Sequence, residues 1–155
     1  MTFTIYDELG DLPHFSLDLD GDEAPPAVDR LRQLLQDADG VLICTPEYAF
    51  GVPGFLKNAL DWTVSSGEFM YKPTIAISAS PSNMGGDKAH ASLLLTLQAE
   101  TAEVVNGGTL TIPRVSKVLN ADGNIADDAI AQALRTALAS LAQAIARRAA
   151  EDAGV

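Results

Sequence analysis

The stretch that decides the fold is Val41-Leu42-Ile43-Cys44-Thr45-Pro46-Glu47-Tyr48-Ala49-Phe50-Gly51-Val52-Pro53-Gly54. Its first four residues are apolar on both faces, which favours a central parallel strand between two helix layers over an edge strand. Thr45-Pro46 ends the strand, and Pro53 can begin a helix because its ring presets a helical φ where no N–H is needed. A buried strand that leads through a loop into a helix predicts an α/β protein.

Strand and helix patterns alternate on both sides of this stretch. The strand patterns cover 2–6, 41–44, 74–80 and 109–112, and the helix patterns cover 26–38, 53–64, 89–104 and 127–151. Asp127 and Asp128 suit the positive end of the last helix. We therefore expect one domain over residues 1–155, a doubly wound parallel sheet of about four strands in a three-layer αβα arrangement.

The helix after Pro53 is apolar on two sides. Leu56, Leu60 and Val64 form one side, and Phe55, Ala59 and Trp62 form the other. One side can cover the sheet. The other is either buried within the same subunit or forms a contact between subunits, and the pattern favours the two equally. The second alternative predicts a homodimer or tetramer.

Composition excludes several classes of function. The chain has 21 acidic and 10 basic residues and a net charge of −11, so a nucleic acid polymer is not expected as a partner. Cys44 is the single cysteine, which permits no disulfide within the chain and is expected to be a buried packing residue. His14 and His90 lack partners at metal-ligand spacing, so we expect surface histidines and no metal site. No apolar run nears the length of a membrane span, and a cytoplasmic protein is expected.

Two loops are the candidate site, because ligands of parallel sheets bind beyond the carboxyl ends of the strands. The first loop follows Cys44 and contains Tyr48, whose ring can pack against a flat heteroaromatic ligand. The second loop, Ser80-Pro81-Ser82-Asn83-Met84-Gly85-Gly86, follows the next buried strand. Its glycines permit close approach of the backbone to a ligand. Its N–H groups lead into a helix, an arrangement that favours negative charge.

The first loop and the following Leu56-Lys57-Asn58-Ala59-Leu60-Asp61-Trp62 resemble the NAD(P)H-dependent FMN reductase family, which includes quinone, chromate and azo reductases. The family's loop reads Thr-Pro-Glu-Tyr-Asn, so Ala49 removes one side-chain amide. The second loop is similar to the family's Ser-x-x-x-x-Gly-Gly. The resemblance extends over residues 4 to 115 and implies a flavodoxin-like fold.

The resemblance implies FMN as cofactor, NAD(P)H as co-substrate and free flavin or a quinone-like compound as acceptor. Hydride transfer between stacked rings requires no acid–base residue, so no catalytic side chain is implied. Tyr48 would line the isoalloxazine, and the second loop would face its N1–C2=O2 edge. The implied cofactor-binding residues are Pro46, Glu47, Tyr48, Ala49, Ser80, Asn83, Met84, Gly85 and Gly86.

One part of the family pattern is not matched. Family members open with a buried strand and a loop rich in Ser and Gly that holds the FMN phosphate, whereas residues 2–13 resemble the family's second strand and the loop after it. In the family's strand order 2-1-3-4-5, about thirty missing residues would remove the neighbour of 41–44. Three alternatives would account for the missing neighbour: the strand at 2–6 shifts inward, another subunit supplies a strand, or the natural start lies upstream. Weak FMN binding follows, and a flavin-free binding or regulatory module is the alternative function.

Overall fold

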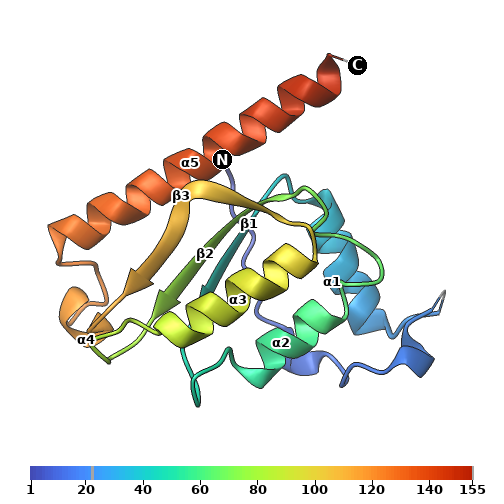
Figure 1. The fold of residues 1–155 in the computed structure, drawn as a ribbon, viewed down its shortest axis with the longest axis horizontal. Helices are drawn as coiled ribbons and strands as arrows, with labels where there is room; N and C mark the ends of the chain where they lie inside the picture. The colour runs from blue at the N-terminus through green and yellow to red at the C-terminus, as the bar shows by residue number, and fades with distance from the viewer. Residues whose placement is uncertain (22, 155) are drawn as a thin grey trace.

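The computed structural model describes residues 1–21 and 23–154. In this part of the chain one sheet forms from three parallel strands in the order β1-β2-β3, namely β1 (Val41–Thr45), β2 (Pro73–Ala79) and β3 (Glu103–Ile112). All three strands end at the same edge of the sheet (Figure 1). The prediction of a parallel α/β sheet is confirmed.

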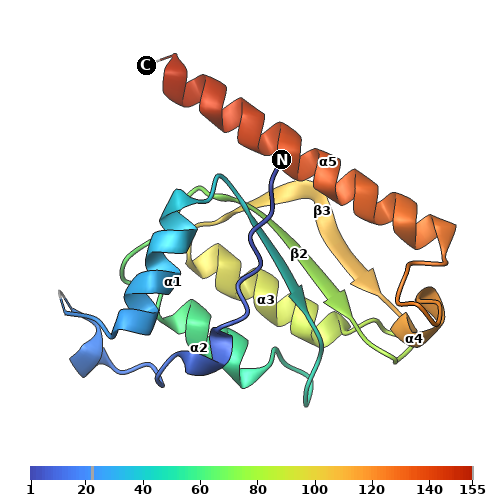
Figure 2. The ribbon, with the colours of Figure 1, turned by 180° about the vertical axis from the view of Figure 1, so that it is seen from behind.

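Helices cover both faces of this sheet. They are α1 (Pro26–Asp37), α2 (Gly54–Asp61), α3 (Asp87–Ala99), the short α4 (Val115–Val118) and α5 (Asp128–Ala153), with 3-10 turns at Leu9–Asp11 and Leu17–Leu19. Figures 1 and 2 show α2 and α3 on one face and α5 on the other. Leu56, Leu60, Leu93 and Leu97 pack with Ile43 on the first face. Leu141 of α5 packs with Ile75 on the second face, so the fold has three layers.

The two apolar sides of α2 are both used within this chain. Leu56 and Leu60 pack toward the sheet, while Ala59 and Trp62 pack against α1 and the N-terminal segment. Trp62 is completely buried, and its Nε1–H donates to the carbonyl oxygen of Pro13 at 2.9 Å. Trp62 therefore cannot serve in a subunit contact, and the alternative of burial within one subunit holds for this residue.

Helix α5 is anchored at its start and along one face. The Asp127 side chain accepts hydrogen bonds from the backbone N–H groups of Ala129 and Ile130, both at 3.0 Å, as expected for an N-cap. Among the described residues α5 is the one helix long and apolar enough to cross a membrane, a criterion that core helices also meet. Its Leu141 packs against Ile75 of the sheet. That interface accounts for the apolar stripe.

Residues 2–6, predicted as a strand, are extended but do not join the sheet. Their backbone makes no hydrogen bond to another described residue, and Phe3 and Ile5 are 55% and 86% exposed. Figure 2 shows this segment as an extended trace that starts near α5 and descends toward α2. The described sheet thus has three strands and not about four. A strand requires a neighbour for its N–H and C=O groups, and β-branched composition does not report whether one is within reach.

Strand β1 lies at the edge of the described sheet and not at its centre. It pairs with β2 on one side and with no described strand on the other. Ile43 is buried, but Cys44 points to the opposite face and is exposed. On that face the apolar cluster beneath α5 includes Leu42 but not Cys44. The predictions of a central strand and of a buried Cys44 are therefore wrong, because the apolar pattern does not show how far the neighbouring elements extend.

The boundary between α3 and β3 also differs from the pattern. The predicted helix 89–104 ends at Ala99, and Thr101 has a left-handed φ of 57°. Glu103 then pairs with Pro73, so the strand begins six residues before the predicted 109. A register shift opposite Thr74–Ala76 carries β3 past Gly107 and Gly108. Apolar residues at 102 and 104 continued the helical spacing in the sequence, but strand pairing prevailed.

Candidate functional site

Three segments meet at the carboxyl ends of the strands. The first loop (46–53) follows β1, the second loop (80–86) follows β2, and a third segment (113–118) follows β3. The sequence predicted the first two. Because the strands are parallel, their ends lie side by side at one edge of the sheet (Figure 1).

The first loop contains a tight turn that presents aromatic rings to solvent. The backbone N–H groups of Tyr48 and Gly51 donate to each other's carbonyl oxygens at 3.0 Å. Ala49 and Phe50 between them have positive φ values of 48° and 61°. The position of Ala49 thus requires a left-handed backbone, which Asn tolerates better than Ala. Tyr48 and Phe50 are 63% and 80% exposed.

The second loop is held against the third segment by close backbone contacts. Gly85 has a φ of 64°, and a Cβ added there would lie 2.9 Å from the backbone nitrogen of Pro113. The buried Ser78 hydroxyl donates to the Gly85 carbonyl oxygen at 2.7 Å. The Ser80 hydroxyl accepts from the Ser82 N–H at 3.1 Å. Asn83 and Met84 lie at the exposed tip of the loop.

Glu47 joins the first loop to the second. Its Oε2 accepts hydrogen bonds from the backbone N–H groups of Lys88 and Ala89, at 2.9 and 3.0 Å, in the first turn of α3. The carboxylate of this predicted cofactor contact is therefore engaged with the protein. The sequence predicted that N–H groups at the start of this helix face the polar edge of the flavin. Two of these N–H groups instead donate to Glu47.

Arg114 is a site residue that the sequence analysis missed. It follows β3 directly, has a left-handed φ of 50°, and its side chain is exposed. Its Nε–H donates to the Asn83 Oδ1 at 2.8 Å, and its backbone N–H donates to the Ser82 carbonyl oxygen at 2.9 Å. Among the described residues, two further cations lie in these segments and the first turn of α3. They are Lys117 and Lys88, and Lys88 is paired with Asp87 at 3.0 Å. The sequence did contain a signal for Arg114. The carboxyl end of a third parallel strand lies at the same edge as the other two, so the residues after 109–112 belong to the candidate site.

His90 was expected at the surface, and the structure buries it. The residue lies in the first turn of α3 with 9% exposure, and its Nδ1 has no hydrogen-bond partner among the described residues. Burial lowers the pKa of the His90 imidazole below its usual 6.5. His90 lies on the buried face of α3, together with Leu93 and Leu97. The sequence pattern did not show which face of this helix is buried.

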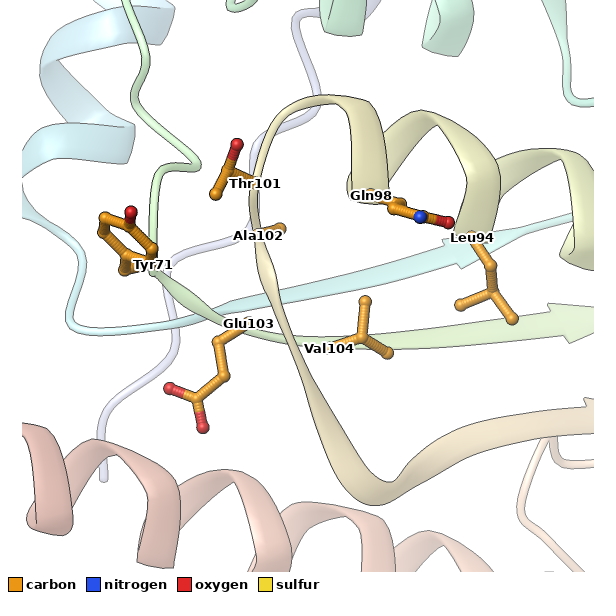
Figure 3. Close-up of a pocket in the computed structure, with 7 residues that line it drawn as sticks. All are labelled: Tyr71, Leu94, Gln98, Thr101, Ala102, Glu103 and Val104. Atoms are coloured by element: carbon orange, nitrogen blue, oxygen red, sulfur yellow. The ribbon is translucent and has the colours of Figure 1, made fainter.

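A hollow of about 630 Å³ lies away from these loops, at the amino ends of β2 and β3 (Figure 3). It is lined by Tyr71, Leu94, Gln98, Thr101, Ala102, Glu103 and Val104. Its acid, Glu103, is paired with Arg147. The hollow is open and mostly apolar, with no convergent set of polar groups, whereas the carboxyl edge has three polar segments. We place the candidate site at the carboxyl edge for this reason.

Proteins of one family resemble this chain over most of its length. The model of the family described as NADPH-dependent FMN reductase matches residues 1–117, which confirms the resemblance seen in the two loops. An NAD(P)H-dependent FMN reductase of Pseudomonas aeruginosa is 30% identical over 86% of this chain and 74% of its own length. A quinone reductase of Pseudomonas putida is 37% identical over 58% of this chain and 50% of its own length.

Among solved structures, the flavoenzyme FerB of Paracoccus denitrificans, an NAD(P)H:(acceptor) oxidoreductase, superposes with a TM-score of 0.79 at 32% identity. The match covers 90% of this chain and 78% of FerB. The chain thus spans from half to about three quarters of the relatives named here. The family match, the sequence identity and the shared fold together show that this chain belongs to the NADPH-dependent FMN reductase family.

Proposed function

We propose that this protein is an NAD(P)H-dependent FMN oxidoreductase that passes two electrons to free flavin, a quinone or a similar acceptor by a ping-pong route. The observation that carries the proposal is the pairing of the two loops at the carboxyl edge through the Glu47 carboxylate. Bound FMN would supply the hydride acceptor between the two substrates. The protein's part is to hold and orient the rings.

The isoalloxazine ring fits the residues present. Tyr48 offers an exposed aromatic ring, and Met84 an exposed apolar side chain, from two adjacent loops. Gly85 and Gly86 both have positive φ and set the shape of the second loop, and both are buried against neighbouring segments of the chain. Together with Pro46, Ala49, Ser80 and Asn83 they form the binding set that we propose. These groups supply an apolar face and backbone amides, which a flat ring with one polar edge requires.

The FMN phosphate finds less support in the described residues. At the carboxyl edge the cations that form no ion pair within residues 1–21 and 23–154 are Arg114 and Lys117, and of these Arg114 contacts the second loop. The chain as a whole carries a charge of −11. Each charge-assisted hydrogen bond to a phosphate contributes on the order of 1.5–3 kcal/mol, so a sparse set lowers affinity by a thousandfold or more. We therefore propose that FMN binds weakly and that riboflavin is affected less.

Titration of the purified chain with FMN and with riboflavin tests both proposals. A shift in the flavin absorption band on addition of either ligand, with NADPH oxidation when a quinone is added, supports the oxidoreductase. Riboflavin affinity equal to or above that for FMN supports the weak phosphate site. FMN binding at micromolar concentration or tighter, and well above riboflavin, contradicts it.

A flavin-free binding or regulatory module is the second candidate. The sparse cation set at the carboxyl edge favours it, because the scaffold and loops could persist without the cofactor. A colourless protein whose spectrum and thermal stability ignore FMN and riboflavin supports this candidate. The same result excludes the oxidoreductase.

We further propose a homodimer or tetramer in the cytoplasm. With Trp62 buried, the support comes from other side chains on the α2 and α3 side, where Phe55, Val64 and Leu95 are 50%, 58% and 68% exposed. Large exposed apolar groups on one side are typical of subunit contacts. Light scattering of Phe55→Asp and Leu95→Glu tests the proposal. A wild-type protein that is monomeric at micromolar concentration contradicts it.

A further inference from the structure

Helix α3 begins without a cap of its own. Its N-cap residue is Gly86, which has a φ of 80° and no side chain to accept a hydrogen bond. The first N–H groups of a helix have no partner within the helix, and a nearby Ser, Thr, Asp or Asn commonly accepts from them. An acceptor for this helix therefore comes from another segment of the chain or from water.

Glu47 supplies that acceptor from 41 residues upstream. Its Oε2 accepts from the Lys88 N–H at 2.9 Å and from the Ala89 N–H at 3.0 Å. A Cβ added at Gly86 would lie 3.4 Å from the Glu47 Cβ and 3.3 Å from the Ser78 Cβ. Gly86 thus provides both the left-handed backbone and the space that lets the carboxylate reach the helix.

The Glu47 side chain is fixed from its own side as well. Pro46 precedes it, and the buried Thr45 hydroxyl donates to the Pro46 carbonyl oxygen at 2.9 Å. The hydrogen-bonded turn of Tyr48 and Gly51 follows it. A carboxylate between a stiff backbone and a helix end has little freedom to turn toward a ligand.

We propose that Glu47 is a positioning residue, which sets the spacing between the two loops and occupies the positive end of α3. The inference rests on the proposed function in that these loops hold the flavin ring. It deepens that function in one respect: Glu47 acts through α3 and does not itself contact the ligand. The positive end of α3 is then less available to an anionic group such as a phosphate, because a carboxylate already accepts from two of its donors.

The test compares Glu47→Ala with Glu47→Asp and Glu47→Gln, and uses Glu8→Gln as the matched control at an exposed ion pair with Arg30. The Asp variant keeps the charge but is one methylene too short, and the Gln variant keeps an acceptor of the same length. Amide hydrogen exchange of the ligand-free protein is measured by NMR. Loss of a helix cap should speed exchange of the Lys88 and Ala89 amides about tenfold in the Ala and Asp variants.

The Gln and Glu8→Gln variants should change these amides by less than about threefold, because an acceptor for the helix remains. Unchanged exchange at Lys88 and Ala89 in both the Ala and Asp variants would overturn the proposal. The Asp variant decides the matter if the Ala variant does not fold.

A second readout separates positioning from capping. The backbone order parameters of Gly51 and Gly86 should fall in the Ala variant, and its riboflavin affinity should weaken about tenfold while Glu47→Gln stays near wild type. Faster exchange with unchanged order parameters and affinity would show a cap that positions nothing, which refutes the proposal. Wild-type protein that binds no flavin refutes the proposed function alone, because the exchange and order measurements need no ligand.

Discussion

Protonation of Glu100 should control how the stability of this protein depends on pH. Only 7% of the residue is exposed. Burial raises the pKa of the Glu100 carboxyl from 4.5 to about 7, an effect that a hydrogen bond with Thr63 partly offsets and that the charge of Glu68 increases. The acid is therefore still largely protonated at a pH where the unfolded chain would be ionised.

The hydrogen bonds around Glu100 offset its burial only in part. The Thr63 hydroxyl oxygen lies 2.9 Å from the Leu60 carbonyl oxygen and 2.8 Å from the Glu100 Oε2. The Thr63 hydroxyl donates to the Glu100 Oε2, which favours the ionised acid, but the effect of burial is larger. The Glu100 Oε1 has no partner among the described residues. A neutral acid tolerates this better than a carboxylate does.

The sign and size follow from the raised pKa. The stabilisation from protonated Glu100 is fully present below the unfolded pKa of 4.5 and is lost as the pH rises through about 7. The difference between these two pKa values corresponds to a change of about 3 kcal/mol in the free energy of unfolding. Glu100→Gln cannot ionise and keeps the shape and a donor. Relative to wild type its free energy of unfolding should rise between pH 4 and 8 by up to about 3 kcal/mol.

Urea unfolding followed by Trp62 fluorescence at several pH values measures this difference. Glu103→Gln, which alters an exposed pair with Arg147 and keeps Glu100, is the control, and its stability should depend on pH as that of the wild type does. A difference between Glu100→Gln and wild type that stays constant from pH 4 to 8 would refute the reasoning. It would mean that Glu100 titrates alike in the folded and unfolded chains.

Three further predictions concern packing. Gly85→Val should lower stability by about 2–3 kcal/mol in thermal unfolding, because its Cβ would lie 2.9 Å from the Pro113 nitrogen at a φ of 64°; wild-type stability would contradict this contact. Trp62→Ala should cost about 3–5 kcal/mol in urea unfolding without changing the oligomeric state, since the ring is buried within one subunit; loss of oligomers in a folded variant would oppose this. Native protein should react fully with a thiol reagent at the exposed Cys44, but more slowly than a free thiol because partial burial raises the pKa of the Cys44 thiol; protection until unfolding would show that this face is covered.

The sequence alone determined the class of fold, the two loops and the family. Local signals suffice for these features. Pro46 and Pro53 act on the backbone beside them, the apolar spacing of α2 follows from helix geometry, and the Asp127 cap lies within three residues of its donors. The loop sequence from Thr45 to Gly54 is specific enough that its resemblance agreed with the family match.

The tertiary structure alone decided which neighbour each of these residues meets. The sequence could not show that Glu47 caps a helix that starts 40 residues later, that Arg114 joins the second loop, or that Trp62 turns inward. It also placed β1 in the centre of the sheet and buried Cys44, both wrongly. The physical reason is common to these cases. Periodicity reports which face of an element is apolar, whereas burial and hydrogen bonding depend on which distant segment covers that face.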